Sequence, residues 1–240
     1  MSVNKLFIQN KIPYYPLPIT HYPLPITHYP LPITYPLSPF LMSPLWKYVS
    51  PGIPDELFER LPGIPMSQRE IRLLLISALR LEANSVVWDI GAGTGTIPVE
   101  IGLLCPQGQI IAIERDEEVA NLIQLNCDRF EVKNVQIVIG SAPQCLKQIT
   151  TPPQRACIEG GKGIKPILQQ VWEYLPNTGR IVVTAASLEA LYEVSESFTQ
   201  LHARNVEVVQ SAVNRLETRG NSRRLAAVDP LFILSAEKLE

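Results

Sequence analysis

The sequence predicts an α/β fold in which helices cover both faces of a mostly parallel, seven-stranded sheet. Between about residues 85 and 202, short apolar runs alternate with amphipathic helical patterns, which is typical of strand–helix–strand units. Closer to the C-terminus, two apolar runs follow each other with no helical pattern between them. Such a pair predicts an antiparallel hairpin at one edge of the sheet.

Residues 1–50 have a different composition and are predicted to form a disordered, proline-rich tail outside the fold. The unit Tyr-Pro-Leu-Pro-Ile-Thr-His repeats almost without change between Tyr15 and Thr34. Its prolines remove backbone N–H donors every few residues, so neither a helix nor a central strand can form. An extended, polyproline-like conformation is expected instead.

The repeat has two interpretations. In tandem copies, the DNA heptamer CCCATTA is translated as Pro-Ile-Thr-His-Tyr-Pro-Leu, so the segment is interpreted as translated repeat DNA, and Met42 becomes an alternative start codon. Proline-rich segments also dock in aromatic grooves, so a motif that recruits a partner is the alternative.

The folded domain is predicted over residues 51–240. Ser67-Gln-Arg-Glu70 matches a capping box, in which Ser67 and Glu70 satisfy each other's backbone N–H groups at the start of a helix. Apolar residues at helical spacing follow from Ile71 to Leu79. Strands are expected at 85–90, 109–114, 135–139, 155–158, 180–185, 206–213 and 225–234, with helices at 97–104, 117–130, 143–149, 164–174 and 188–202 and a polar turn at 217–223.

The first strand runs directly into the glycine-rich sequence Asp89-Ile-Gly-Ala-Gly-Thr-Gly95. Glycines let a backbone turn tightly and approach a ligand closely, and open parallel sheets bind ligands at the carboxyl ends of their strands. A dinucleotide fingerprint would need a glycine at position 96, where this chain has Thr96. The spacing matches instead the nucleotide loop of Rossmann-like class I methyltransferases, which bind S-adenosylmethionine (SAM).

Two further segments fit a nucleotide site at the same edge of the sheet. The second strand ends at Glu114, where the ribose diol of a nucleotide needs a paired acceptor; a solvated surface charge is the alternative. Gly140-Ser-Ala-Pro143 follows the third strand, where methyltransferases hold adenine; an ordinary strand-to-helix turn is the alternative.

Over about residues 51–235, the chain resembles the decarboxylating precorrin-6B C15-methyltransferases of corrin (cobalamin) biosynthesis. The Pro-Gly-Ile-Pro-Met-Ser sequence at 62–67 and the Glu-Gly-Gly-Lys-Gly loop at 159–163 are the most particular matches. The resemblance implies methylation at C15 coupled to decarboxylation of the C12 acetate, on precorrin-6B or its cobalt form, and both forms stay open. The other matching stretches are 52–58, 68–72, 89–95, 112–116, 140–143, 179–184 and 229–230.

The resemblance also implies which residues hold SAM. Relatives tend to have Asp where this chain has Ser141, a departure that weakens the expectation of a carboxylate at the adenine amino group, although a serine can still hydrogen-bond. Ser67 is assigned both a helix cap and a cofactor contact. The implied cofactor-binding residues are Ser67, Gly91, Ala92, Gly93, Thr94, Gly95, Glu114, Ser141 and Ala142.

The Glu-Gly-Gly-Lys-Gly loop stands where many N-methyltransferases have Asn/Asp-Pro-Pro-Tyr after their fourth strand. Its glycines make room for a large flat substrate such as a tetrapyrrole; a flexible turn is the alternative. The carboxylates of a precorrin should face cationic side chains, and the three arginines of 217–224 are expected to overhang the cleft. The sequence identifies no proton donor for decarboxylation. The substrate-cleft candidates are Arg69, Lys162, Lys165, Arg219, Arg223 and Arg224.

Composition bounds the remaining classes of function. The net charge of −2 argues against a nucleic-acid partner. No apolar run is long enough to span a membrane or to serve as a secretory signal, so a cytoplasmic enzyme is expected. The cysteines lie in apolar stretches without a C-x-x-C pair, which predicts buried free thiols and no metal site. They are Cys105, Cys127, Cys145 and Cys157.

Two rival functions stay open. One is another class I SAM methyltransferase that acts on tRNA or on protein carboxyl groups, and the other is a non-catalytic SAM-binding adaptor recruited through the proline-rich tail. By resemblance, the chain is expected to form a homotetramer, with the unpaired edge strand of the C-terminal hairpin as a contact surface. A separate C5-methyltransferase is a further candidate partner, since none is fused to this chain.

Overall fold

The computed structural model describes residues 45–159 and 163–239, which all belong to one unit of the chain. The heptad repeat, Met42 and Lys162 lie outside these described residues, so the predictions made for them stay predictions. Within the two described ranges, no helix is long and apolar enough to cross a membrane, and no cluster of His, Cys, Asp or Glu is arranged to hold a metal ion.

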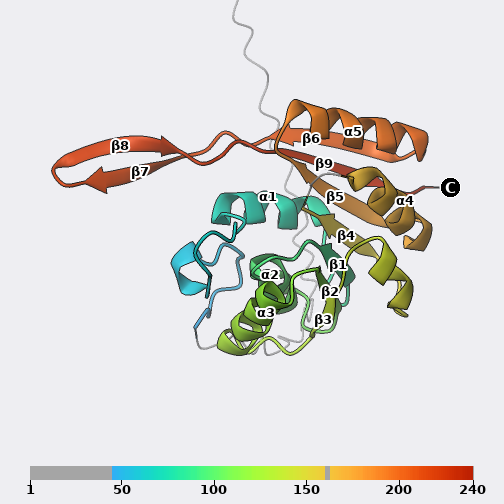
Figure 1. The fold of residues 1–240 in the computed structure, drawn as a ribbon, viewed down its shortest axis with the longest axis horizontal. Helices are drawn as coiled ribbons and strands as arrows, with labels where there is room; N and C mark the ends of the chain where they lie inside the picture. Colours follow the sequence, from blue (N-terminus) through green and yellow to red (C-terminus); the bar gives the residue numbers. More distant parts are fainter. Residues whose placement is uncertain (1–44, 160–162, 240) are drawn as a thin grey trace, which may run out of the picture. The chain divides into compact units, whose positions relative to one another are not determined.

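A seven-stranded sheet forms the centre of the fold, with the strand order β3-β2-β1-β4-β5-β9-β6 (Figure 1). The strands from β1 to β5 run parallel, as the alternation of strands and helices predicts. β9 lies antiparallel between β5 and the edge strand β6, so the predicted antiparallel pair is confirmed. The strands of this sheet are β1 (Val86–Ile90), β2 (Gln109–Glu114), β3 (Val135–Ile139), β4 (Arg155–Ile158), β5 (Arg180–Ala185), β6 (Arg204–Gln210) and β9 (Phe232–Glu237).

Helices cover both faces of the sheet. α1, α2 and α3 pack on the face that carries Val87 and Ala112, whereas α4 and α5 pack on the face that carries Trp88 and Ile111. Because both faces are apolar, the central strands appear in the sequence as continuous apolar runs. The helices are α1 (Arg69–Leu79), α2 (Thr96–Leu104), α3 (Glu117–Arg129), α4 (Ile164–Tyr174) and α5 (Leu188–Gln200), with short 3-10 turns at Asp55–Leu57 and Gln144–Gln148.

Most predicted elements agree with the structure. Four of the predicted strands and the helix at 164–174 have the observed bounds, and the predicted helix at 143–149 is a 3-10 turn over Gln144–Gln148. The cysteines are free and buried, as predicted. Burial raises the pKa of the Cys105 thiol to about 11 and that of the Cys127 thiol to about 12. These thiols therefore stay protonated and unreactive near neutral pH.

The predicted capping box at the start of α1 is wrong. Gln68 is the N-cap residue, and its side chain makes no capping hydrogen bond. The Asp55 carboxylate accepts the backbone N–H of Arg69 at 2.9 Å, while the Ser67 hydroxyl donates to Glu159. Partners from distant segments thus replace the local exchange that the sequence pattern predicts.

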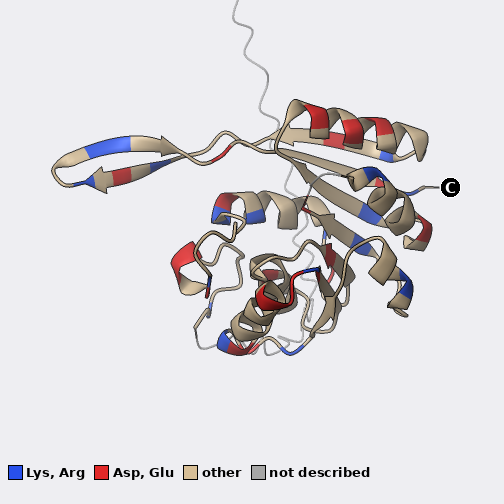
Figure 2. Ribbon diagram, viewed as in Figure 1, with Lys and Arg blue, Asp and Glu red and all other residues tan. Residues whose placement is uncertain are grey.

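The C-terminal hairpin also departs from the prediction. Between β6 and β9, the chain forms a two-stranded ribbon of β7 (Asn214–Arg219) and β8 (Ser222–Ala227), which pair only with each other in the described part of the chain. The predicted polar turn at 217–223 is therefore mostly strand, and the strand predicted at 225–234 is interrupted before β9. Charged bands lie along both strands of the ribbon (Figure 2). Since both faces of the ribbon meet solvent, its strands need no apolar face and resemble a turn in the sequence.

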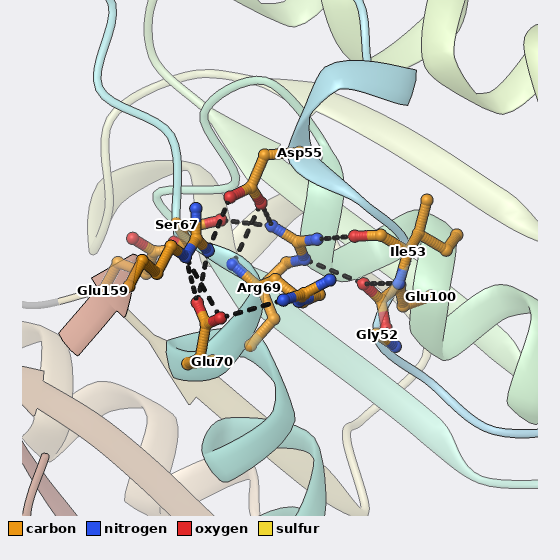
Figure 3. Close-up of polar contacts among 10 residues, drawn as sticks. Gly52, Ile53, Asp55, Ser67, Arg69, Glu70, Glu100 and Glu159 are labelled. Atoms are coloured by element: carbon orange, nitrogen blue, oxygen red, sulfur yellow. Dashed lines mark hydrogen bonds and ion pairs between the residues drawn. The ribbon is translucent and has the colours of Figure 1, made fainter. Parts of the chain in front are cut away.

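A buried ion-pair cluster fastens the segment before α1 to the helices (Figure 3). Arg72 of α1 is fully buried, and its guanidinium donates to Glu100 of α2 at 2.8 Å and to Asp55 at 2.7 Å. It also donates to the carbonyl oxygens of Ile53 and Ser67. Glu100 in turn accepts the backbone N–H of Ile53 at 3.2 Å. The cluster thereby joins two helices and the preceding segment through paired charges.

We predict that Arg72→Ala lowers the free energy of unfolding by about 3–5 kcal/mol, because the Glu100 carboxylate stays buried without its cation. Urea denaturation followed by circular dichroism measures the loss. Arg60→Ala, at an exposed arginine, is the control and should change the same quantity by less than about 0.5 kcal/mol. A loss below about 1 kcal/mol for Arg72→Ala, the size typical of a surface ion pair, would contradict the role given to this cluster.

Candidate functional site

A cavity of about 1180 Å³ lies at the carboxyl ends of β1, β2 and β4. An open parallel sheet binds ligands at this edge, next to the point where the strand order reverses between β1 and β4. The cavity is bordered by the loop after β1, the segment 64–68 before α1 and the segment 228–231 before β9. Its volume exceeds the ~300–1,000 Å³ of most small-molecule pockets, so it has room for a nucleoside and part of a larger ligand.

The loop after β1 turns on three glycines with positive φ. The φ angle is +81° at Gly91, +53° at Gly93 and +82° at Gly95, values that residues with a side chain rarely adopt. The backbone N–H groups of Gly91 and Ala92 donate to the Ile113 carbonyl of β2 at 2.9 and 3.0 Å, which fastens the loop to the neighbouring strand. The loop residues that line the cavity are Gly91, Ala92, Gly93 and Thr94.

Gly95 lies outside the cavity lining, and its small size lets α2 pack closely against α3. A Cβ atom at Gly95 would lie 2.9 Å from the Cα atom of Ile123, closer than carbon atoms approach in packed proteins. The structure thus shows a packing role for Gly95, and the cofactor contact expected from the sequence stays a prediction.

Glu114, at the end of β2, lines the cavity beside the glycine loop. Its Oε2 atom accepts the backbone N–H of Gly93 at 3.0 Å, and its Oε1 atom accepts those of Arg115 and Asp116 at 2.9 and 3.1 Å. These three donors fix the carboxylate against the loop. A merely solvated surface charge would lack such donors. All the predicted cofactor-binding residues except Gly95 line this cavity, including Ser67, Ser141 and Ala142.

Two acidic residues beside the loop were not predicted as site residues from the sequence, and Asp89 of β1 is the first. It is fully buried, and no N–H or O–H group of the described residues donates to its carboxylate. Burial, followed by the charge of Glu159, raises the pKa of Asp89 well above its usual value, while the thiol of Cys157 opposes the shift. Asp89 does not line the cavity itself, although Ile90 and the loop residues that follow it do. The available signal was its position at the head of the glycine motif.

Glu159 is the second, and it lines the cavity directly after β4. Its backbone N–H donates to the Ile90 carbonyl at 3.1 Å, which extends the β1–β4 pairing by one residue. The Ser67 hydroxyl donates to its Oε1 atom at 2.5 Å. Burial raises the pKa of Glu159, and the hydrogen bond from Ser67 and the charge of Arg72 act against that shift. Its signal in the sequence was its place at the start of the Glu-Gly-Gly-Lys-Gly loop.

Comparison with known proteins places the chain in a family. Residues 58–238 match the precorrin methyltransferase domain. The chain belongs to the precorrin methyltransferase family. It is similar to a probable cobalt-precorrin-6B C(15)-methyltransferase (decarboxylating) from Saccharolobus solfataricus, with 38% identity over 197 residues that cover 80% of this chain and 98% of the relative.

Solved structures agree with this assignment. A precorrin-6Y C5,15-methyltransferase from Geobacter metallireducens GS-15 superposes with a TM-score of 0.73 and 30% identity, over 80% of this chain and all of that one. A protein described as precorrin 8W decarboxylase from Methanobacterium thermoautotrophicum gives a TM-score of 0.70 and 27% identity, over 77% of this chain and 98% of the other. The predicted Rossmann-like methyltransferase fold is confirmed, and the protein is an enzyme of the methyltransferase class.

In this precorrin methyltransferase, the hairpin arginines do not reach the cavity. Arg219 and Arg224 pair with Glu217 within the ribbon, at 3.5 and 3.3 Å, and Arg223 is exposed on β8. The chain borders the cavity only from Val228 onward, after the ribbon has ended at Ala227. At ~3.3 Å per residue, the arginines of the ribbon lie roughly 13–20 Å further along its strands. The expectation that they overhang this cavity is therefore not met within one chain. Of the other candidates, Arg69 and Lys165 do not line the cavity, and Lys162 lies outside the described residues.

A different hairpin residue, Arg215, ties the ribbon to the cavity wall. Its Nε atom donates to both carboxylate oxygens of Glu70 at 3.1 Å, and its Nη2 atom donates to Asp55 at 2.9 Å. The hydrogen bond from Arg215 lowers the pKa of Glu70 to about 2. Asp55 is also bound by Arg72, which holds the Ser67 carbonyl. Contacts therefore run without a break from the base of the ribbon to the segment that lines the cavity (Figure 3).

We predict that Gly95→Ala lowers the free energy of unfolding by about 2–4 kcal/mol, because a positive φ and a clash with α3 act together. Gly63→Ala is the matched control, since Gly63 has nearly the same φ of +83° but a Cβ atom there would meet no described residue within 4 Å. The control should lose only about 1 kcal/mol of backbone strain. Urea denaturation measures both variants, and equal losses would mean that Gly95 has no special packing role.

The pKa shifts of Asp89 and Glu159 predict that the ligand-free enzyme loses stability as the pH rises. Both groups have folded-state pKa values above the ordinary 3.8 and 4.5. When the pH is above these ordinary values, the folded protein binds more protons than the unfolded chain, so stability falls as the pH rises. Asp89→Asn should flatten this decline between about pH 5 and pH 8. The melting temperature measured across that range tests it.

Asp128→Asn, on the exposed side of α3, is the control for this experiment and should leave the slope of melting temperature against pH unchanged. The prediction fails if the wild-type midpoint rises over the range, or if Asp89→Asn keeps the wild-type slope.

Proposed function

We propose that this chain is a SAM-dependent C15-methyltransferase that also decarboxylates its substrate, precorrin-6B or cobalt-precorrin-6B. The observation that carries the proposal is the cavity, which begins at the glycine loop and extends past the end of β4 to α4, in a chain of the precorrin methyltransferase family. The relatives named as probable cobalt-precorrin-6B C(15)-methyltransferases (decarboxylating) support the same activity, since they match over 80% of this chain.

The residues at the glycine-loop end of the cavity fit SAM. Glu114, whose carboxylate is fixed by backbone N–H groups, can accept the ribose diol, and Ser141 and Ala142 border the expected place of the adenine. When bound, SAM supplies a methyl group activated by its positively charged sulfur.

The chain itself has to position the reacting carbon of the substrate and exclude water. Ile64 and Met66 line the cavity from the segment before α1, and Ile164 and Ile167 line it from α4. Apolar surfaces of this kind suit a flat conjugated macrocycle and displace water from it. Methyl transfer on this proposal depends on holding the macrocycle against the glycine loop.

The rival functions lack comparable support. The net charge of −2 gives no basic excess for binding a tRNA backbone. No observation on the described residues favours a protein carboxyl group as the substrate or a non-catalytic adaptor.

The proposal extends to assembly as a homotetramer through the ribbon and the edge strand β6. Leu216 and Leu225 face each other across the ribbon and are 65% and 71% exposed. Val206, Val208 and Val209 of β6 are each about half exposed. An edge strand with exposed apolar side chains is a surface that a second copy can cover. We further propose that the enzyme is cytoplasmic and that a separate C5-methyltransferase is its partner.

Incubation of the purified protein with SAM and either precorrin-6B or its cobalt form tests the function. Mass spectrometry follows methyl gain, and gas analysis follows release of carbon dioxide. We expect one methyl group gained for each carbon dioxide released with at least one of the two substrates, because both changes belong to one reaction.

Each departure from that result has a separate meaning. Methyl gain without carbon dioxide would refute the decarboxylating activity, and no turnover with either substrate would refute the substrate class. Titration calorimetry with SAM and its demethylated product tests the cofactor, and an absence of heat with both would refute SAM binding.

A further inference from the structure

Decarboxylation and methylation together require one proton to move within the substrate. When the C12 acetate loses carbon dioxide, its C–C bond breaks, and the remaining carbon becomes a methyl group only when it gains a proton. C15 exchanges a hydrogen for a methyl group, so it releases a proton. The proton displaced at C15 equals the proton gained at the C12 side chain, which leaves the reaction balanced without a further reactant. An enzyme group that accepts and delivers that proton in place would speed both steps.

Among the described residues that line the cavity, carboxyl groups belong to Glu114, Asp116, Glu159 and Asp229. Glu114 accepts three backbone N–H groups with its two oxygens, and Asp116 caps α3. Asp229 is exposed to solvent. Glu159 is partly buried, as is Glu114, but unlike Glu114 it has a carboxylate oxygen, Oε2, that accepts no hydrogen bond from the described residues.

We infer that Glu159 carries this proton, and that it protonates the carbon left by decarboxylation and takes up the proton displaced from C15. The inference rests on the proposed function and adds to it a catalytic residue that the sequence did not identify. In one step, the O–H bond of Glu159 breaks as a C–H bond forms at the C12 side chain, which leaves a carboxylate. In the other, that carboxylate accepts the proton from C15, and the acid is restored.

The position of Glu159 suits both steps. It stands beside the glycine loop, since a Cβ atom at Gly91 would lie 3.6 Å from the Glu159 carbonyl oxygen. The hydroxyl of Ser67, on the segment before α1, binds the Oε1 atom and so orients the carboxyl group. The Oε2 atom is left to face the substrate, next to the loop that is proposed to hold the methyl donor.

The charges that face Glu159 favour its protonated form. Burial is the main cause that raises its pKa, and the negative charge of Glu114 on β2 adds to it. Asp89 on β1 and Cys157 on β4 also interact with its charge. Arg72 on α1 is the cation that lowers the pKa, but its donors bind other acceptors, and it forms no ion pair with Glu159 among the described residues. A carboxylic acid in such a place can keep a proton until the reaction takes it.

Glu159→Gln, which keeps the shape but carries no transferable proton, tests the inference. We expect the rate of carbon dioxide release to fall by about 10²–10⁴-fold, while the Kd for SAM measured by calorimetry changes by less than about 3-fold. The wild-type rate should decline on the alkaline side as Glu159 ionises, and the residual activity of the variant should lack that decline. Glu159→Asp should recover part of the rate together with the alkaline decline, because it keeps an acid at shorter reach.

An infrared titration gives a readout without turnover. The wild-type protein should show a carboxyl C=O band that disappears as Glu159 ionises and that is missing in Glu159→Gln. Glu196→Gln, on the exposed side of α5, is the matched control and should keep the band, the rate and the pH profile.

Release of carbon dioxide at the wild-type rate by Glu159→Gln would overturn the inference. A fall in rate matched by an equal fall in SAM affinity would overturn it too, because Glu159 would then be a cofactor ligand. So would an alkaline decline that vanishes in Asp229→Asn but persists in Glu159→Gln. A folded, SAM-bound wild-type protein without turnover would refute the proposed function and this inference with it, whereas an active wild type beside an equally active Glu159→Gln refutes the inference alone.

Discussion

The buried guanidinium of Arg72 is the interaction on which the geometry of the site depends. It binds carboxylates and carbonyl groups from α2 and from the segment that precedes α1, and its planar set of donors suits such divergent acceptors. The segment that ends at Ser67 has little regular structure of its own. Its distance from the strand ends, and with it the width of the cavity, is therefore set by a charge buried in the neighbouring helix.

From Arg72, contacts continue in two directions. Through Glu100 they reach α2, whose first turn follows the glycine loop, and through Asp55 they reach Arg215 at the base of the ribbon. The ribbon and the cavity wall thus share Asp55 as a common partner. In the proposed homotetramer, a second copy would cover the ribbon, whose Arg215 binds Asp55. Asp55 is bound by Arg72, which in turn holds Ser67.

Acidic side chains gather at the cavity wall and behind it, where water is scarce. Asp89 is buried without an N–H or O–H donor among the described residues, and Glu159 and Glu114 lie on the adjacent strand ends. This arrangement is unfavourable in the ligand-free protein, because neighbouring carboxylates repel each other and lose hydration. A cationic ligand would relieve the repulsion, and an acid that keeps its proton relieves part of it. Functional sites commonly lower stability in this way.

Much of the fold and of the site could be predicted, and each miss has its own physical cause. The alternating runs located the central strands, and the Asp-x-Gly-x-Gly pattern located the loop that borders the cavity. The capping box failed because Ser67 bonds to a residue 92 positions away, and the ribbon was taken for a turn because isolated strands need no apolar face. Asp89 stood in a quoted motif, but its lack of an N–H or O–H donor among the described residues is not visible in a sequence.

By itself, the sequence determined the order of the central strands and helices, the family and the place of the glycine loop, because these depend on periodicity and on motifs of neighbouring residues. Only the tertiary structure decided which partners Ser67 and Glu70 take, how deeply Asp89 is buried and which carboxyl group can hold a proton. Those properties depend on contacts between distant segments, such as the pair of Glu70 and Arg215, which are 145 positions apart. Local patterns carry no information about such pairs until the chain has folded.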